Sequence, residues 1–228
     1  MNSKSSTLIE FFGISGVGKT TCAEKLSEEI GKGRTVDNYI GKQKLIKKIR
    51  LILLLTLTHP FVTFKAIKVV VFSKQNSLSD FIINVYNLLY VISVFKNKTQ
   101  YVTIMDQGLF QSIISINLSA NKDITEQIKS LLDKIIKKPL IVVRVESSLG
   151  LIRKRILNRS DNFSRVENGK SIKLEKVEEA YNLVNNIFLK ELINSDNNYI
   201  QVISIDNEYV TLEENIEKIK QSLFSLGV

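Results

Sequence analysis

The chain has 228 residues, of which 44% are hydrophobic and 24% are charged, so it is predicted to form one domain over residues 1–228. Its 32 lysine and arginine residues outnumber 23 aspartate and glutamate residues, and the net charge of +9 suits an anionic partner or ligand. One cysteine and one histidine exclude an intramolecular disulfide and a Cys/His zinc site, and the cytoplasm is the expected location.

The first predicted strand, Leu8–Phe12, leads directly into a complete phosphate-binding loop pattern. The next eight residues read G-I-S-G-V-G-K-T and match G-x-x-x-x-G-K-[ST]. The chain then becomes helical, and Gly31 is placed to end the helix. The apolar residues of this helix recur at spacing four: Cys22, Leu26 and Ile30. Because the first strand begins so close to Met1, we expect no secretory signal.

A strand, a glycine-rich turn and a helix N-terminus together form an anion-binding site, because backbone N–H groups and the helix dipole point at the bound phosphates. Lys19 can then reach the β- and γ-phosphates of ATP, and the Thr20 hydroxyl can bind Mg²⁺. The residues expected to contact the nucleotide here are Gly13, Ser15, Gly16, Val17, Gly18, Lys19, Thr20 and Thr21.

Residues 40–98 are predicted to form a helical insert that binds the phosphate acceptor. It follows a weak strand candidate at Arg34–Asp37 and contains three predicted helices, at Lys42–Leu57, Phe61–Phe72 and Leu78–Phe95. Its basic start interleaves lysines with apolar residues as a solvated amphipathic helix does, which disfavours a nucleic-acid partner. Pro60 and several charged residues interrupt the apolar stretch, so no transmembrane span is expected, whereas peripheral membrane contact stays open.

The remaining predicted strands are Tyr101–Met105, Leu140–Val145 and Tyr199–Ile205, and helical patterns separate them. The last helix begins near Thr211, with Glu214 three residues on in the spacing of a capping box. This alternation predicts an α/β fold with a doubly wound, parallel five-stranded sheet and helices on both faces. Ligands of such sheets bind at the carboxyl ends of the strands.

Asp106 directly follows the third predicted strand, where P-loop folds place a Mg²⁺-associated carboxylate. It could hold a metal-bound water or accept a proton from an attacking hydroxyl. An aspartate two residues before Gly108 also suits a turn, and that alternative stays open. Thr20 and Asp106 are therefore the predicted metal residues. Just downstream, Gln111 could line an acceptor pocket together with Phe110, for which core packing is an equal alternative.

A basic helix is predicted after the fourth strand, and it leads into a polar loop. Spacing four places Arg155 and Arg159 on one helical face, and Arg165 lies in the loop. Guanidinium groups can bridge the oxygens of a transferring phosphate, and a closing loop would exclude water. We therefore expect a lid over residues 159–172, with a solvated helix end as the alternative.

With these elements in order, the chain resembles the P-loop nucleotide kinases, most closely the thymidylate kinase-like branch. The matching segments are G-I-S-G-V-G-K-T-T, the strand ending at Asp106, R-x-x-x-R at 155–159, V-E-E-A-Y-N-L-V at 177–184 and V-I-S-I-D-N at 202–207. The resemblance implies Mg²⁺- and ATP-dependent phosphotransfer with Arg155 at the nucleotide and with Asp206 and Asn207 beside the adenine. The catalytic residues that it implies are Lys19, Asp106, Arg159 and Arg165.

Two departures set the acceptor side apart from thymidylate kinases. Gln107 stands where that family has an arginine, and Asp37-Asn38-Tyr39 stands where it has Arg-Glu-Pro-Gly. A small-molecule acceptor is expected, first a nucleoside or nucleotide. A sugar, a glycan precursor, a lipid-associated alcohol, and an ATPase or switch without an acceptor are the alternatives, and a homodimer also stays open.

Overall fold

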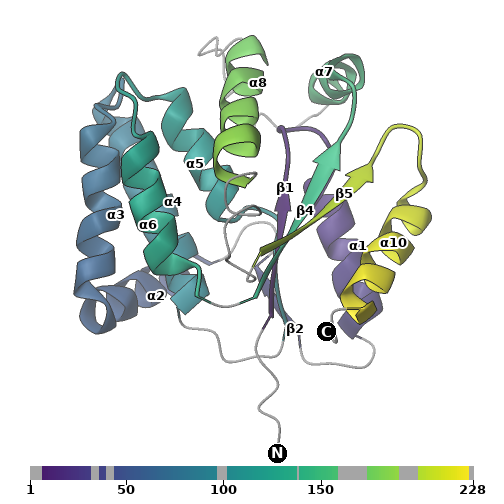
Figure 1. The fold of residues 1–228 in the computed structure, drawn as a ribbon, viewed down its shortest axis with the longest axis horizontal. Coiled ribbons are helices and arrows are strands. Elements are labelled where there is room, and N and C mark those ends of the chain that lie inside the picture. Colours follow the sequence, from purple (N-terminus) through teal and green to yellow (C-terminus); the bar gives the residue numbers. More distant parts are fainter. Residues whose placement is uncertain are drawn as a thin grey trace, which may run out of the picture.

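A computed structural model of the chain describes residues 7–31, 36–39, 44–96, 102–137, 139–158, 174–189 and 200–225. Its centre is a sheet of five strands: β1 (Thr7–Phe12), β2 (Val36–Tyr39), β3 (Val102–Met105), β4 (Leu140–Glu146) and β5 (Ile200–Asp206). All neighbouring strands are parallel, in the order β2-β3-β1-β4-β5 (Figure 1). The central position of β1 brings the loop after it to the middle of the carboxyl edge of the sheet.

Helices cover both faces of this sheet, so the predicted doubly wound α/β fold is confirmed (Figure 1). One face carries α1 (Lys19–Gly31), α7 (Leu149–Leu157) and α10 (Leu212–Ser225). The other side carries α2 (Leu45–Thr58), α3 (Pro60–Phe72), α4 (Leu78–Lys96), α5 (Leu109–Leu118), α6 (Thr125–Ile135) and α8 (Leu174–Leu183), which continues as the π-helical turn η1 (Val184–Leu189).

The side chains of β1 alternate between two apolar layers, as a period of two requires. Ile9 and Phe11 pack in the layer under α1 and α10, where Cys22 is also buried. Leu8 and Phe12 pack in the layer that contains α4, α5 and α6. Burial on both faces explains why this strand is a nearly continuous apolar run.

The termini of the outer helices follow their local sequence signals. Helix α1 ends at Gly31, as predicted. The predicted capping box before α10 is also confirmed, since Oε2 of Glu214 accepts hydrogen bonds from Oγ1 (2.8 Å) and the N–H (3.1 Å) of Thr211. The capping box fixes the start of α10.

The three helices predicted between the second and third strands are present as α2, α3 and α4. Pro60 occupies the first turn of α3, where its missing N–H costs no helical hydrogen bond, and α2 and α3 meet at an angle of 113°. By length and composition alone, α4 could cross a membrane, as could the bent pair of α2 and α3 together. Half of the apolar window of α4 is buried inside the protein, against its neighbouring helices.

Candidate active site

The loop between β1 and α1 has a backbone that requires glycine at several of its positions. Gly16 and Gly18 have φ angles of 90° and 103°, in the left-handed region that side chains disfavour. At Gly13 the restriction is steric, because a Cβ there would lie 2.6 Å from the carbonyl oxygen of Val145 on β4. The motif glycines are therefore explained by the shape of the loop, which turns its N–H groups toward one place.

Lys19 is the first residue of α1, and its ammonium group folds back over the loop. Its Nζ donates hydrogen bonds to the carbonyl oxygens of Gly13 (2.8 Å) and Ile14 (3.0 Å). Val17 is buried beneath the loop, Ser15 is half-buried within it, and Thr21 is exposed on the first turn of α1. The ammonium group and the helix N-terminus thus make the loop an anion site.

Thr20 and Asp106 are 86 residues apart in sequence and are joined by a hydrogen bond at the carboxyl edge of the sheet. Oγ1 of Thr20 donates to Oδ2 of the buried Asp106, at 2.8 Å. Hydroxyl and carboxylate oxygens are the hard ligands that Mg²⁺ prefers, and nucleotide phosphates and water usually complete its shell. In the described part of the chain no group of three or more His, Cys, Asp or Glu residues could hold a metal alone. The pair therefore fits Mg²⁺ that is shared with phosphates.

Two residues from distant elements fasten the far side of the loop. Nη1 of Arg155 on α7 donates to the carbonyl oxygen of Val17 (3.1 Å), and its Nη2 donates to that of Asn207 (3.0 Å). Nδ2 of Asn207 also donates to the carbonyl oxygen of Val17, at 2.6 Å. A Cβ at Gly18 would collide with this amide group. Arg155 is thus placed beside the loop, and Asn207 is a contact that belongs to the same site.

Asp206 precedes Asn207 at the end of β5, but its carboxylate serves the local turn. Oδ1 accepts hydrogen bonds from the N–H groups of Glu208 (2.8 Å) and Tyr209 (3.2 Å). Asn207, rather than Asp206, touches the phosphate-binding loop. The other two predicted arginines, Arg159 and Arg165, lie outside the described residues, as does the predicted lid over 159–172.

Glu10 is a buried carboxyl group in the middle of β1 that sequence reasoning missed. Its Oε2 accepts a hydrogen bond from the N–H of Leu109 (2.9 Å), and its Oε1 accepts one from that of Phe110 (2.7 Å). These are the first N–H groups of α5, which begins just after Asp106, so Glu10 anchors this helix. The only available signal was a single acidic residue within an apolar strand.

Glu10 gives a prediction for stability against pH. Burial raises the pKa of Glu10 from 4.5 to about 7, while the backbone N–H donors oppose the shift. The folded chain thus binds more protons than the unfolded chain between these two values, so stability falls as pH rises between them and levels off above 7. Relative to Glu10→Gln, which cannot titrate, the unfolding free energy should fall by about 3 kcal/mol across this window. Urea denaturation at stepped pH measures it, and parallel curves for the two proteins would contradict it.

A second polar cluster faces Asp106 from the helical insert. Nζ of Lys48 on α2 lies 4.8 Å from the ring centroid of Tyr90 and 6.0 Å from that of Tyr86, both on α4. The ring of Tyr39, at the end of β2, is 6.4 Å from that of Tyr90. Partial burial lowers the pKa of Lys48, and the Asp106 carboxylate acts in the opposite direction. Asp106 thus interacts with both sides: it accepts a hydrogen bond from Thr20 of the loop region, and its charge acts on Lys48 of this cluster.

Several polar atoms on the acceptor side are buried without a hydrogen-bond partner among the described residues. They are the hydroxyls of Tyr86 and Tyr90 and Oε1 of Gln111. Phe110, in contrast, is fully buried and packs edge-on to Phe12 at 6.1 Å, so the core alternative is correct for it. Buried polar atoms without partners are costly unless a ligand or water completes them.

No protein-family model and no curated protein matches the sequence. Solved structures do match it over nearly its full length. Thymidylate kinase from Candida albicans is 15% identical, with a TM-score of 0.56 over 98% of this chain and 93% of that chain. YorR protein from Bacillus subtilis, solved with phosphorylated GDP, is 18% identical, with a TM-score of 0.51 over 96% of each chain.

Deoxyadenosine kinase from M. mycoides, solved with bound dATP, is 16% identical, with a TM-score of 0.54 over 96% of this chain and all 100% of that one. Structural similarity over nearly the whole chain establishes the fold, whereas sequence identities this low do not identify the phosphate acceptor. The strand order, the loop after β1 and the full-length likeness agree with the resemblance read from the motifs. The chain therefore has the fold of the P-loop nucleotide kinases.

Proposed function

We propose that the chain is an ATP- and Mg²⁺-dependent phosphotransferase whose acceptor is a nucleoside or nucleotide. The observation that carries this proposal is the hydrogen bond between Thr20 and Asp106, which joins the phosphate-binding loop to the end of β3. That bond puts the predicted metal residues of both motifs at one point, beside Lys19. The named activities of the structural neighbours, two nucleotide or nucleoside kinases among them, support the same reading.

On the donor side, the loop N–H groups and the Lys19 ammonium bind the triphosphate and hold it in one orientation. Asp106 orients the acceptor hydroxyl or phosphate and can accept a proton at Oδ2. When bound, Mg²⁺ neutralises charge on the transferring phosphate. Arg159 and Arg165 are proposed to close over the site from the segment 159–172, and Arg155 holds the loop that they would meet.

On the acceptor side, we propose that Lys48 supplies the positive charge that an arginine after Asp106 would have supplied. Tyr86 and Tyr90 turn their aromatic faces toward its ammonium group, and their hydroxyls have no hydrogen-bond partner among the described residues. Tyr39 packs beside Tyr90, with the ammonium group of Lys47 over its own ring. Aromatic faces can stack on a base, and hydroxyl and ammonium groups can bind a ribose or a phosphate. A nucleotide-dependent switch has no phosphate acceptor to bind, so that alternative does not explain a cluster of lysine and tyrosine side chains beside Asp106.

The experiment that tests the proposal measures ADP release from Mg·ATP with a panel of acceptors. The panel holds nucleosides, nucleoside monophosphates, sugars and a lipid extract, and Lys19→Ala serves as the blank. Stimulation by a nucleoside or nucleotide, with a phosphorylated product found by mass spectrometry, is the expected result. Stimulation by a sugar or lipid alcohol alone would overturn the acceptor assignment. Slow hydrolysis that no acceptor stimulates would overturn the phosphotransferase assignment.

Lys48→Ala is expected to raise the KM for the acceptor by about tenfold to a hundredfold, because a charged hydrogen bond contributes about 1.5–3 kcal/mol. The KM for ATP should stay within about twofold, since no loop contact is lost. Steady-state kinetics with each substrate varied in turn measure both constants. Lys44→Ala, an exposed lysine just before α2, is the matched control. An equal rise in both KM values would remove Lys48 from the acceptor site.

A further inference from the structure

The outer faces of α2 and α3 carry large apolar side chains that are exposed to solvent. On α2 they recur at helical spacing along one side, as Ile46 (82% exposed), Ile49, Leu53 and Leu57 (80%). On α3 they are Phe61 (86%), Phe64 (68%) and Phe72. The opposite sides of both helices pack against α4, so these residues face away from the sheet (Figure 1). Soluble monomers rarely expose so many apolar side chains together, and such patches mark interaction sites.

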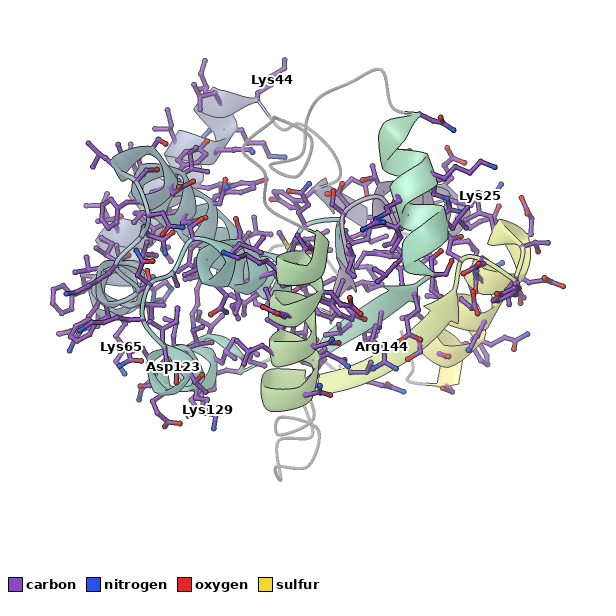
Figure 2. The ribbon with its side chains drawn as sticks, turned by 90° about the horizontal axis from the view of Figure 1, so that it is seen from above. Lys25, Lys44, Lys65, Asp123, Lys129 and Arg144 are labelled. Atoms are coloured by element: carbon purple, nitrogen blue, oxygen red, sulfur yellow. The ribbon has the colours of Figure 1, made fainter. Side chains whose placement is uncertain are left out.

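Positive charge accompanies these apolar side chains. Lys68 is exposed between Phe64 and Phe72 on α3, with its Nζ 5.2 Å from the centroid of the Phe72 ring, and Arg50 is exposed among the apolar residues of α2. Lys65 is half-buried at the border with α6, where its Nζ donates a hydrogen bond to Oγ of Ser130 at 3.1 Å. Between residues 44 and 96 the sequence has eight lysine or arginine residues, and Asp80 is its single acidic residue. Seen from above, Lys65 lies beside Asp123 and Lys129 at one side of the molecule, Lys44 lies at another edge, and Lys25 lies across the molecule from Lys65 (Figure 2). We call this surface of α2 and α3 the apolar–basic face.

The charge of the face discriminates between the partners that could cover it. A second copy docked through the same face would bring like charges together at the edge of an apolar contact, which is unfavourable. Nucleic acid would satisfy the lysines but would leave Phe61, Phe64 and Leu57 exposed. An anionic lipid bilayer satisfies both parts, because apolar side chains enter the acyl boundary while lysines contact the headgroups.

We propose that the apolar–basic face docks the protein onto an anionic membrane surface. Helices α2 and α3, of 14 and 13 residues, lie in the plane of the headgroups, and neither is long enough to cross the bilayer. Their bend of 113° at Pro60 spreads the contact in two directions within that plane. Thr20 and Asp106 belong to other elements, and Lys48 leaves α2 on the side that packs against the α4 tyrosines, so docking through the outer sides of α2 and α3 leaves these residues uncovered.

Co-sedimentation of the full chain with vesicles tests this proposal. Binding to vesicles of phosphatidylcholine with about one third phosphatidylglycerol is expected, with weak binding to pure phosphatidylcholine and release by high salt. Phe61→Ser with Phe64→Ser should lower the partition coefficient at least about tenfold. Phe224→Ser is the matched control, because Phe224 is 82% exposed on α10 across the sheet. An equal loss in both variants, or no loss in either, would overturn the proposal.

The contribution of the lysines to membrane binding is tested with a second pair of variants, one on the apolar–basic face and one away from it. Lys65→Glu with Lys68→Glu should lower binding to the anionic vesicles by about thirtyfold or more, from roughly one kcal/mol of attraction per lysine near the surface. Lys25→Glu with Lys218→Glu makes the same charge change on α1 and α10 and should have a much smaller effect. Equal effects of the two pairs would mean that net charge alone drives binding, which contradicts a defined docking face.

A gain of signal protects the test from variants that fail to fold. The chain has no tryptophan, so Phe64→Trp introduces a single reporter that keeps an aromatic side chain on the face. Its fluorescence should shift to the blue on anionic vesicles and be quenched by brominated lipid, whereas Phe224→Trp should change little. A Phe64→Trp signal that depends on protein concentration and ignores vesicles would show self-association instead, and would overturn the proposal. The Lys19→Ala variant should bind vesicles normally, whatever its activity.

Discussion

Asp106→Ala is expected to lower the rate of phosphotransfer by about a hundredfold to a thousandfold while the affinity for nucleotide stays within about threefold. The carboxylate accepts a hydrogen bond from the Thr20 hydroxyl at 2.8 Å and acts electrostatically on Lys48. In the proposed function it therefore stands between the phosphate donor and the phosphate acceptor. In the proposed function the loop and Lys19 contact the triphosphate, and the substitution leaves both in place. Single-turnover kinetics with saturating ATP, together with calorimetry of ATP binding, separate the two effects.

The matched control for this prediction is Asp133→Ala, which removes an exposed carboxylate from α6. It should leave both transfer and nucleotide binding unchanged. The thermal midpoint of the Asp106 variant should be recorded, because a buried group is being removed. Normal kinetics in a folded Asp106→Ala protein would make Asp106 a turn residue and would remove the main support for the proposed phosphotransferase.

The donor half of the site could be predicted from the sequence because it is local. Eight consecutive residues build the loop, and their backbone demands are visible as glycines at Gly13, Gly16 and Gly18. Four of the strands were equally accessible, since a parallel sheet buries both faces of a strand and such a strand is then a nearly continuous apolar run. The exception is β2 (Val36–Tyr39), which reads V-D-N-Y and lies two residues beyond the weak candidate at Arg34–Asp37. The position of Asp106 then followed from the order of elements. The structure places it within hydrogen-bonding distance of Thr20.

The contacts that fasten this site were inaccessible for a physical reason. Glu10 caps a helix that begins 99 residues later, and Asn207 reaches the loop from the far end of the chain. Such pairings depend on strand register, and a shift of one residue would have sent the Asp206 side chain toward the loop in place of Asn207. The family resemblance placed both Asp206 and Asn207 beside the adenine, and in the structure Asn207 is the one whose side chain contacts the loop.

The cluster around Lys48 and the apolar–basic face could not be predicted because of the composition of the insert. The helices of the insert are apolar on nearly every side, so periodicity located them without showing which side is buried. Val70 of α3 is fully buried while Phe72 is nearly half exposed, and both are ordinary core residues by type. Tyr86 and Tyr90 beside Lys48 come from α4, and Tyr39 beside Tyr90 comes from β2, which lies close to α4 only in the folded chain.

Lys19→Ala is expected to reduce kcat/KM for ATP by about a thousandfold or more, which corresponds to about 4 kcal/mol of transition-state stabilisation. In the folded chain the ammonium group bonds to the carbonyl oxygens of Gly13 and Ile14, so it is already positioned over the phosphate-binding loop. A point charge held there stabilises negative charge that develops on the transferring phosphate, and water cannot replace it. ADP release under saturating acceptor measures the loss.

The matched control is Lys25→Ala, which removes a lysine from the same helix six residues further on and should keep full activity. Both variants should retain the fold, because α1 remains anchored by Cys22 and Leu26 in the core and alanine favours helix. The Lys19→Arg variant separates the role of charge from the role of shape, because it preserves the positive charge on a side chain of different geometry. It should recover only part of the rate that Lys19→Ala loses. If Lys19→Ala retains normal turnover, the nucleotide does not bind at this loop, and the role proposed for Asp106 fails with it.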